Sequence, residues 1–357
     1  MSNAKVPVAV VGLGVGRAHI EGFKSLPEMY EVVAVCDVNE DKARQVAAQF
    51  NIPRVYTSFD ELCRRDDLEV VDICTPPFLH FGQIQHGLAA GKHVISEKPL
   101  VRSLREVDEL VVAQAQSGKY LMPIFQKRFG NGLQKLKLLI AEGLTGKAYL
   151  TTVETQWRRR AEYYAVPWRG KWQTELGGTL LGHAIHAHDM LTYALGPVKS
   201  VFARATTRVN PIETEDCAVV SLEMADGSLA GLSATTGSAI EMSRARFCFS
   251  NLVAESNTDA YNHSHDPWLF KGDTPELDAQ IQAALARFEP QPERFVGQFY
   301  RFYHTLRDSA PLPVTLDDAR QSLELISAMY YSARVGQPVE LPIGPDHPYY
   351  NGWLPNR

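Results

Sequence analysis

The sequence VPVAVVGLGVGRAH, at residues 6–19, begins with an unbroken apolar run of strand-forming residues. Closely spaced glycines follow this run, and a polar segment of helical character follows the glycines. A buried strand that passes through a tight glycine turn into a helix can bind a dinucleotide, because the free N–H groups of the helix face the pyrophosphate. The stretch therefore predicts a nucleotide-binding strand, turn and helix.

The glycines have the spacing Gly12-x-Gly14-x-Gly16, and Arg17 stands where a G-x-G-x-x-G motif would have its third glycine. We expect Gly12 to form the tight turn and Gly14 to let the backbone approach the pyrophosphate. Glycine turns also occur in many loops, so this motif needs support from the rest of the chain. The predicted cofactor contacts in the turn are Gly12, Leu13, Gly14 and Val15.

Asp37 provides such support. It follows a second apolar run, EVVAVC at residues 31–36, near the distance of roughly 20 residues at which a carboxylate binds the adenosine ribose. The acid favours NAD over NADP, because a 2′-phosphate would lie against its charge and the acids Glu40 and Asp41 follow. The alternative is that Asp37 only caps the helix that begins near Asn39.

Length and composition indicate a globular protein of two domains. A chain of 357 residues exceeds one ordinary core, and we place the domains at residues 1–128 and 129–357. A net charge of −5 gives no reason to expect nucleic acid or a membrane surface as a partner. No window approaches the ~20 apolar residues of a membrane span, and the N-terminus lacks a signal-peptide core. The five cysteines have no zinc spacing, so we expect a cytoplasmic protein with reduced thiols.

Short apolar runs and helical patterns alternate from residue 6 to residue 125, with helical patterns at residues 40–50, 79–90 and 104–117. This alternation predicts a parallel sheet with helices on both faces, whose ligands bind at the carboxyl ends of the strands. From residue 129 the pattern changes to consecutive strands, two of them joined by the turn Asp226-Gly227. A D-G turn between strands is typical of antiparallel pairing, so we expect an antiparallel sheet in the second domain.

Further motifs lie at the predicted strand ends and in the second domain. They are Thr75-Pro76 with His80, Glu97-Lys98-Pro99, Gln126 with Arg128-Phe129, and Gly177-Gly178 with His186-x-x-Asp189. Together with the glycine turn, His19 and Asp37, these motifs resemble the Gfo/Idh/MocA family, named after glucose-fructose oxidoreductase and inositol dehydrogenase. The resemblance runs over nearly the whole chain, and its most specific parts are the E-K-P and the later G-G…H-x-x-D.

The resemblance implies an α/β protein with an N-terminal Rossmann doubly wound parallel sheet and a C-terminal α/β domain with an open, mostly antiparallel sheet. It also implies an NAD(P)-dependent oxidoreductase that acts on CH–OH groups, as a homodimer or homotetramer joined through the open sheet. The cofactor contacts that it adds are Thr75, Pro76, His80, Glu97, Gln126, Trp168 and Arg169.

Lys98 is the predicted catalytic residue. At the end of a central strand, partial desolvation and a nearby cofactor charge can lower its pKa, so that it exchanges a proton with a substrate hydroxyl. The resemblance assigns that role to the matching lysine, and His186 matches the substrate-site histidine of the family. Because Gly182 stands where the family commonly has aspartate, we expect Lys98 and His186 to share the acid–base work. The alternative is a surface lysine paired with Glu97.

Three histidines lie between Gly178 and Asp189. If the segment is helical, His183, His186 and Asp189 share one face, whereas His188 points elsewhere. We expect His183 to hold a substrate hydroxyl, and the alternative is that His183 and His188 have no role in binding. A zinc site is a further alternative, but no paired H-x-x-x-H is present, so no metal is predicted.

Residues 157–172, WRRRAEYYAVPWRGKW, are rich in aromatic and basic side chains. Aromatic rings stack on the C–H faces of sugars and arginines bind hydroxyls or a carboxylate, so the loop suits a carbohydrate or sugar acid. Nucleic-acid sites share this composition, but the run is single and the chain is acidic. The predicted substrate contacts are Lys98, Arg128, Trp157, Tyr164, Trp172, His183 and His186.

Aromatic residues also gather in the tail at residues 345–353, after the last predicted helix. An exposed tail of this kind normally docks on a surface. We expect it to cover either the active site of its own chain or that of a neighbour.

The leading hypothesis from the sequence is an NAD-dependent dehydrogenase that transfers hydride between nicotinamide and a carbinol carbon of a sugar, sugar acid or polyol. Because Gly182 replaces the usual acid, a redox-neutral epimerase, lyase or glycosidase that recycles bound NAD is an alternative. A third hypothesis is a non-catalytic NAD-binding sensor, against which the retained Lys98 and His186 argue.

Overall fold

The computed structural model describes residues 4–355, which divide into two compact units. The first unit comprises the residues up to Phe125 together with Phe295–Arg320, and the second comprises Gln126–Arg294 and the residues from Gln321. The division lies slightly before residue 128, where the sequence suggested a boundary, and residues 295–320 lie in the first unit rather than the second. No helix in the described part of the chain is both long and apolar enough to cross a membrane.

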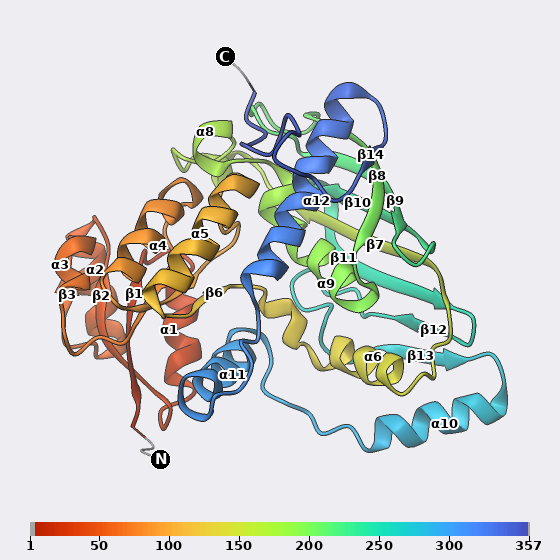
Figure 1. The fold of residues 1–357 in the computed structure, drawn as a ribbon, viewed down its shortest axis with the longest axis horizontal. Helices are drawn as coiled ribbons and strands as arrows, with labels where there is room; N and C mark the ends of the chain where they lie inside the picture. Colours follow the sequence, from red (N-terminus) through yellow and green to blue (C-terminus); the bar gives the residue numbers. More distant parts are fainter. Residues whose placement is uncertain (1–3, 356–357) are drawn as a thin grey trace. The chain divides into compact units, whose positions relative to one another are not determined.

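The first unit contains a six-stranded sheet with the order β3-β2-β1-β4-β5-β6 (Figure 1). All of its strand pairs are parallel. The strand order reverses between β1 and β4, which is where open sheets of this kind bind nucleotides. The strands are β1 (Val6–Val11), β2 (Tyr30–Cys36), β3 (Val55–Tyr56), β4 (Val70–Ile73), β5 (His93–Ser96) and β6 (Leu121–Pro123). The predicted Rossmann sheet is confirmed.

Helices connect these strands: α1 (Gly16–Lys24), α2 (Glu40–Phe50), α3 (Phe59–Cys63), η1 (Pro77–Leu79) with α4 (His80–Ala89), and α5 (Leu104–Ser117). Helix α11 (Arg294–Asp308), far along the chain, also packs on this unit. The ring of Phe299 stacks on Phe23 of α1 at 4.0 Å between centroids. The side-chain amide of Gln298 donates to the carbonyl of Pro123 at 2.7 Å and accepts the N–H of Phe125 at 3.2 Å. Helix α11 therefore fixes the end of β6.

The second unit contains an eight-stranded sheet with the order β13-β12-β11-β7-β10-β9-β8-β14. Within the described residues, β10 and β7 pair in parallel and the remaining pairs are antiparallel. The predicted mostly antiparallel sheet is confirmed, although the short strands β13 and β14 were not expected. The strands are β7 (Ala148–Arg158), β8 (Val198–Thr206), β9 (Cys217–Met224), β10 (Leu229–Thr235), β11 (Gly237–Phe249), β12 (Leu252–Glu255), β13 (Leu269–Gly272) and β14 (Val339–Glu340).

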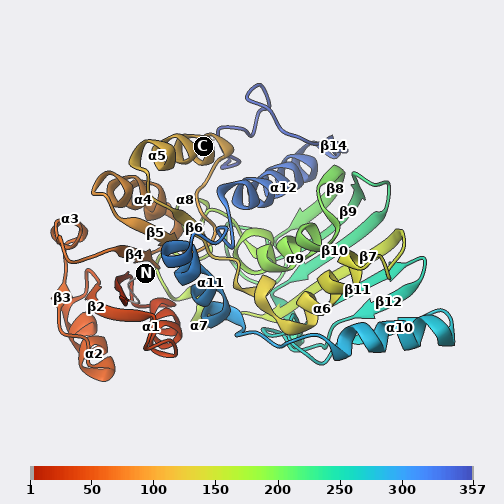
Figure 2. The same ribbon diagram turned by 60° about the horizontal axis from the view of Figure 1, so that its bottom comes forward.

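Helices of the second unit lie together on one face of this sheet (Figure 2). They are α6 (Asn131–Ala141), α9 (Ile185–Leu195), α10 (Pro275–Ala286) and most of α12 (Leu316–Val335). Burial alternates along the strands, as expected for a sheet with one packed face. On β9, for example, Val220 and Leu222 are buried, whereas Val219 between them is 65% exposed.

The aromatic tail docks on the second unit of its own chain. Trp353 is buried, its indole N–H donates to the carbonyl of Leu176 at 2.6 Å, and its ring packs on Tyr330. Tyr349 is also buried and its hydroxyl accepts a hydrogen bond from Arg334 of α12. The tail therefore packs beside the residue that precedes the G-G motif.

Candidate active site

The glycine turn after β1 has the geometry that a dinucleotide requires. Gly12 has a φ of +85°, and a Cβ there would lie 2.7 Å from the backbone of Cys74. A Cβ on Gly14 would meet no atom within 4 Å, so this is the side from which a phosphate can approach. Helix α1 begins at Gly16 without a side-chain cap or an acid in its first turn, so no carboxylate competes with an anion at this helix N-terminus.

Gly16 takes the role that the third glycine has in the usual motif. A Cβ on Gly16 would lie 2.9 Å from the side chain of Val10 and 3.3 Å from the Cβ of Cys74. The glycine therefore allows close packing of α1 on the sheet, which is the physical requirement behind the third glycine. The unusual spacing changes the position of this contact and not its function.

Asp37, directly after β2, is tied to the glycine turn. Its carboxylate accepts the N–H of Leu13 at 2.9 Å and the N–H of Asn39 at 3.0 Å, and it pairs with the ammonium of Lys42 at 2.8 Å. Burial raises the pKa of Asp37, but the hydrogen bonds from Lys42, Asn39 and Leu13 outweigh it, so the pKa is lowered. The N-cap of α2 is Asn39, so the capping alternative for Asp37 is wrong.

We expect the substitution Asp37→Asn to weaken NAD binding about tenfold and to improve NADP binding relative to NAD. The variant loses a charged hydrogen-bond acceptor, which contributes about 1.5–3 kcal/mol, and it leaves Lys42 as an unopposed cation. Calorimetric titration of the variant with both cofactors measures the change. An unaltered ratio of the two affinities would show that Asp37 does not face the ribose.

His80, the first residue of α4, joins two strand-end loops. Its ring nitrogens lie 2.9 Å from the carbonyl of Pro99 and 2.8 Å from the carbonyl of Thr75. The residue is fully buried, so it holds the loops after β4 and β5 together and presents no polar atom to a cofactor. This position corrects the prediction that His80 contacts the cofactor directly. Thr75 is half-buried and its hydroxyl donates to Gln83 at 2.6 Å.

Lys98 follows β5, at the sheet edge where ligands of parallel sheets bind. The residue is partly exposed, whereas Glu97 before it is 5% exposed. One oxygen of Glu97 accepts the backbone N–H of Lys98 at 3.0 Å. Burial raises the pKa of Glu97, but His19 and Lys98 outweigh it, so this carboxylate is ionised. Glu97 therefore fixes the backbone that carries the predicted catalytic lysine.

Arg128 in η2 (Gln126–Phe129) and Asp189 in α9 form a buried ion pair. The guanidinium donates from Nε at 2.8 Å and from Nη2 at 2.6 Å, and its carbon lies over the ring of Tyr193 at 4.8 Å. Arg128 is 4% exposed, and its guanidinium donates two hydrogen bonds to Asp189. This position corrects the prediction that Arg128 contacts the substrate. The two family motifs thus meet in the second unit and orient α9.

The backbone of the G-G motif binds a buried acid, Glu215, that the sequence did not indicate. A Cβ on Gly178 would lie 1.8 Å from the carbonyl oxygen of Glu215, so only glycine fits there. The Glu215 carboxylate accepts the N–H groups of Gly178 at 3.0 Å and Leu180 at 2.9 Å and the hydroxyl of Tyr330 at 3.0 Å. Burial raises the pKa of Glu215 to about 7. The only sequence signal was an acid just before an apolar strand.

The sequence pattern from residue 178 to residue 195 is helical, but the structure does not form one regular helix there. A π-helical turn, Thr179–His183, ends at Ala184 before α9 begins. His183, His186 and His188 are all buried. The ring of His183 lies 5.5 Å from the ring of Trp157 and 5.5 Å from the ring of Tyr163, as measured between centroids. His183 therefore lies among the aromatic residues that were predicted to face a sugar.

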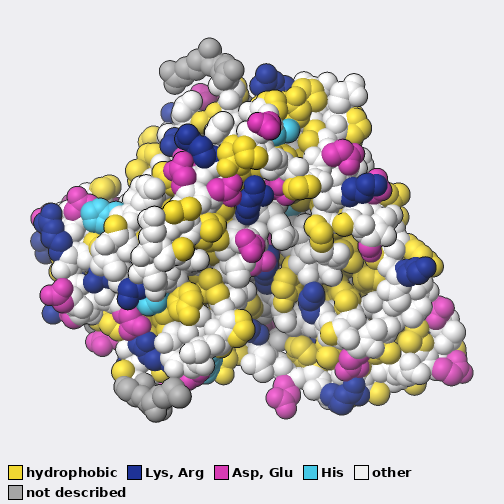
Figure 3. Space-filling model, viewed as in Figure 1, with side chains coloured by type: hydrophobic (Ala, Val, Ile, Leu, Met, Phe, Trp, Pro, Cys, Tyr) yellow, Lys and Arg dark blue, Asp and Glu magenta, His cyan; other side chains and the backbone are white. Residues whose placement is uncertain are grey.

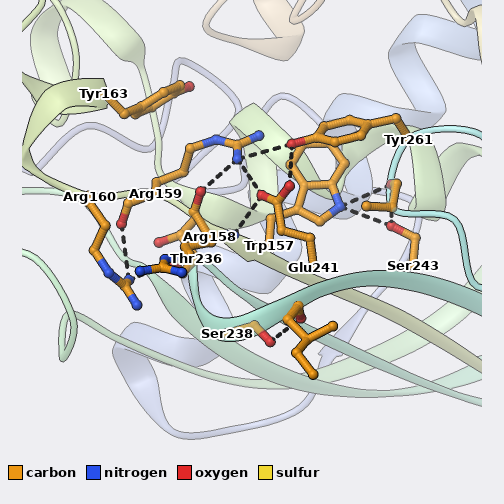
Figure 4. Close-up of polar contacts among 12 residues, drawn as sticks. Trp157, Arg158, Arg159, Arg160, Tyr163, Thr236, Ser238, Glu241, Ser243 and Tyr261 are labelled. Carbon is orange, nitrogen blue, oxygen red and sulfur yellow. Dashed lines mark hydrogen bonds and ion pairs between the residues drawn. The ribbon is translucent and has the colours of Figure 1, made fainter.

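Arg159 lies at the centre of an aromatic and polar cluster (Figure 4). Its guanidinium lies 5.0 Å from the ring of Trp157 and 5.1 Å from that of Tyr163, and it pairs with Glu241 at 2.7 Å. The hydroxyl of Tyr261 donates to the same carboxylate at 2.8 Å. Glu241 and Tyr261 come from distant parts of the chain, so the sequence did not reveal them. Residues 158–163 line an open hollow of about 810 Å³ beside this cluster.

Of the other aromatic residues of the loop, Tyr164 and Trp168 adjoin this cluster, whereas Trp172 lies elsewhere in the second unit. Arg169 stacks on Tyr163 at 3.9 Å and on Trp168 at 4.3 Å, and it pairs with Glu175 at 3.0 Å. Trp172 lines a separate cavity of about 440 Å³ together with residues of α12 and the tail. The structure thus brings Trp157 and His183 together, and it places Trp172 in a different cavity.

Glu175 lies close to the position of the missing acid. A Cβ on Gly182 would lie 3.9 Å from Oε1 of Glu175. An aspartate at position 182 would extend its carboxylate into the same neighbourhood. Glu175 is buried, and it also accepts the N–H of Gly170. The second unit therefore supplies a carboxylate here from another residue.

We expect His188 to make the stability of the protein sensitive to pH. Burial lowers the pKa of His188 to about 3, below the value of about 6.5 in an unfolded chain. Its stabilising contribution is therefore present above pH 6.5 and is lost as the pH falls toward 3, because the unfolded state binds the proton first. Between pH 7 and pH 5 we expect the wild type to lose about 2 kcal/mol more unfolding free energy than His188→Leu, by urea titration. Equal losses would contradict this assignment.

Known protein families match both units. The model of an oxidoreductase family with an NAD-binding Rossmann fold matches residues 6–125, and the Gfo/Idh/MocA C-terminal domain matches residues 133–251. The uncharacterised oxidoreductase sll0816 of Synechocystis sp. is 30% identical over 238 residues, which are 63% of this chain and 64% of that relative. A myo-inositol 2-dehydrogenase of Thermotoga maritima is 28% identical over 62% of this chain and 66% of its own length. These alignments span about two thirds of each relative.

A solved structure matches the fold over almost the whole chain. It is the WlbA dehydrogenase of Bordetella pertussis in complex with NADH and UDP-GlcNAcA, with a TM-score of 0.84 and 27% identity. The match covers 96% of this chain and 100% of that one. From its two matching domains, its glycine turn and its strand-end motifs, the chain belongs to the Gfo/Idh/MocA family of NAD-binding oxidoreductases.

Proposed function

We propose that the chain is an NAD-dependent dehydrogenase that interconverts a CH–OH group and a carbonyl on a sugar, sugar acid or polyol. The observation that carries this proposal is Lys98, partly exposed at the carboxyl end of β5 in a unit whose glycine turn fits a dinucleotide. When bound, NAD accepts hydride from the carbinol carbon or returns it.

The proton steps belong to the residues of the chain. In the oxidation direction, Lys98 takes the proton from the substrate hydroxyl while the carbon loses hydride, and in reduction it returns that proton. His186 of the second unit is the proposed second acid–base group, with the carboxylate of Glu175 in the place of an acid at position 182. The backbone contact from Glu97 orients Lys98 for this transfer.

The aromatic and basic cluster of the second unit supports the proposed substrate class. Trp157, Tyr163 and His183 pack ring against ring, and Arg159 lies beside them with its charge partly balanced by Glu241. Trp157 and His183 are buried, whereas Tyr163 and Arg159 are partly exposed, so the latter two can meet the C–H faces and hydroxyls of a sugar ring. On the face shown in Figure 3, basic and acidic side chains are interspersed, which favours a small molecule over nucleic acid. The relatives named for inositol and bound to UDP-GlcNAcA support the same class.

We also propose that copies of the chain associate through the strand face of the second unit opposite its helices. Apolar side chains are exposed on this face of the strands, including Val219 at 65% and Leu150 at 47%. Association would remove this apolar area from water. Sedimentation of the purified protein tests the proposal, which predicts a dimer or tetramer and excludes a monomer at micromolar concentration.

The proposed activity is tested by NADH absorbance with NAD or NADP and a panel of inositols, aldoses, anhydrosugars and uronic acids. The proposal expects NADH formation from NAD with a cyclic sugar or polyol. Products formed without added cofactor and without NADH would instead favour the redox-neutral alternative. NAD binding by calorimetry with no turnover of any panel member would favour the sensor.

A further inference from the structure

The first unit contains a buried cluster of charged groups that cofactor binding does not explain. His19 lies in the first half of α1 and is 0% exposed. Its Nδ1 lies 2.8 Å from Oδ2 of Asp72, in β4, and its Nε2 lies 3.1 Å from Oε1 of Glu97, after β5. The rings of Phe295 and Phe299 cover the imidazole, with centroids at 4.3 Å and 5.4 Å.

The two contacts of His19 require a particular charge state. An ionised carboxylate only accepts hydrogen bonds, and a neutral imidazole donates from one nitrogen only. Both ring nitrogens of His19 face carboxyl groups, so with both carboxylates ionised the two hydrogen bonds form together only when the ring is an imidazolium. Burial lowers the pKa of His19, but the charge of Asp72 and the contact with Cys74 outweigh it, so the pKa is raised well above its usual value.

The cluster connects three elements of the proposed active site. Helix α1 carries the N–H groups expected to face the pyrophosphate, and Asp72 lies in β4, paired with Val10 of β1. Glu97 uses one oxygen for His19 and the other for the backbone N–H of Lys98. A continuous chain of hydrogen bonds therefore runs from α1 to the lysine, entirely within the first unit.

We propose that His19 is a permanently charged imidazolium that positions Lys98 through Glu97 and links its backbone to the nucleotide-binding helix. His19 touches neither substrate nor cofactor, so it is a positioning residue. The inference rests on the proposed function for the role of Lys98, whereas the charge of His19 does not depend on that function. Without the imidazolium, Asp72 and Glu97 would be two buried carboxylates with no cation between them.

A metal site is the competing explanation for the same residues. His19, Asp72 and Cys74 offer ligand atoms within 4.8 Å of one another among the described residues. However, Nδ1 of His19 already lies at hydrogen-bond distance from Asp72, and Nε2 is turned toward Glu97. A metal would need at least one bare ring nitrogen, because only an unprotonated nitrogen is a ligand. The same experiment therefore separates the two explanations.

The direct test is the protonation state of His19. In protein labelled with ¹⁵N-histidine, at pH 8, we expect both ring nitrogens of His19 to carry protons and to show imidazolium shifts. The spectrum of His19→Asn assigns the signal by its loss, and Glu97→Gln assigns it independently by changing its shift. A bare nitrogen on His19 at pH 8 would overturn the proposal, whether or not the protein has dehydrogenase activity.

The positioning role has a kinetic test. We expect His19→Asn to lower kcat about tenfold to a hundredfold with the Kd for NAD nearly unchanged, because a small displacement of Lys98 disturbs proton transfer. The apparent pKa of Lys98 in the kcat/KM profile should rise, because the charge of Glu97 is no longer balanced. Cys74→Ser is the matched control, since Cys74 contacts His19 at 3.4 Å and its substitution keeps the imidazolium. An unchanged pH profile in His19→Asn would contradict the role.

Discussion

Replacing Lys98 by methionine is expected to lower kcat by about a thousandfold, within the range of 10²–10⁴ that a general acid or base contributes. Methionine has a similar length but carries no proton to exchange. The residue is partly exposed after β5, outside the buried core, so the variant should keep its fold. Steady-state kinetics and calorimetric NAD titration separate the chemical step from cofactor binding, and the Kd for NAD should stay nearly constant.

A second lysine provides the control for this experiment. Lys24, exposed in the last turn of α1, lies in the same unit but away from the strand end. The substitution Lys24→Met removes the same charge and should leave kcat unchanged. Turnover retained in Lys98→Met, with the control also active, would remove Lys98 from the mechanism.

The largest expected loss of stability comes from the buried pair of Arg128 and Asp189. Removing one partner with Arg128→Met leaves an ionised carboxylate in a buried position, which typically costs about 3–5 kcal/mol. Urea unfolding monitored by fluorescence measures the change in the free energy of unfolding. Replacing both partners, in Arg128→Met with Asp189→Leu, should recover much of the loss, because no unpaired charge remains.

The matched control is an exposed ion pair in the same unit. Glu142 and Arg287 lie 2.9 Å apart, and the arginine side chain is 62% exposed. The substitution Glu142→Gln should cost less than about 1 kcal/mol, since solvent screens such pairs. If Arg128→Met also lost less than about 1 kcal/mol of unfolding free energy, water would have to reach the pair of Arg128 and Asp189. That result would contradict the burial of this pair.

Local signals in the sequence were sufficient for much of the first unit. The predicted helix at residues 40–50 is α2, because Asn39 supplies an N-cap that sequence inspection can recognise. The predicted helix at residues 104–117 is α5 for the same reason, with Ser103 as its cap and Gly118 at its end. Apolar strands between such caps leave few alternatives to a parallel sheet.

Features that depend on contacts between residues far apart in the chain could not be predicted from the sequence. Helix α11 has a strong apolar face, but the sequence does not say that this face packs on Phe23 of the first unit. The break at Ala184 arises in a segment whose pattern is helical throughout. Arg128 looked available for a ligand because its partner Asp189 lies far along the chain.

In the candidate site, too, local motifs could be recognised in the sequence, whereas contacts between distant residues could not. The E-K-P and glycine motifs placed Lys98 and the glycine turn correctly at strand ends, since each motif lies directly after its own strand. The carboxylates of Glu175 and Glu215 act through contacts made by folding, and no spacing rule would have selected them. Sequence motifs thus indicated the reaction class, whereas the structure revealed the buried carboxylates that lie beside the G-G motif and Gly182.

The most direct test of the central claim is transfer of hydrogen from substrate carbon to cofactor. With NAD and a sugar or polyol deuterated at the carbinol carbon, mass spectrometry should detect singly deuterated NADH, and Lys98→Met should form about a thousandfold less. Deuterium that stays in the sugar products, or NADH without deuterium, would contradict the proposal that this chain is a dehydrogenase of CH–OH groups.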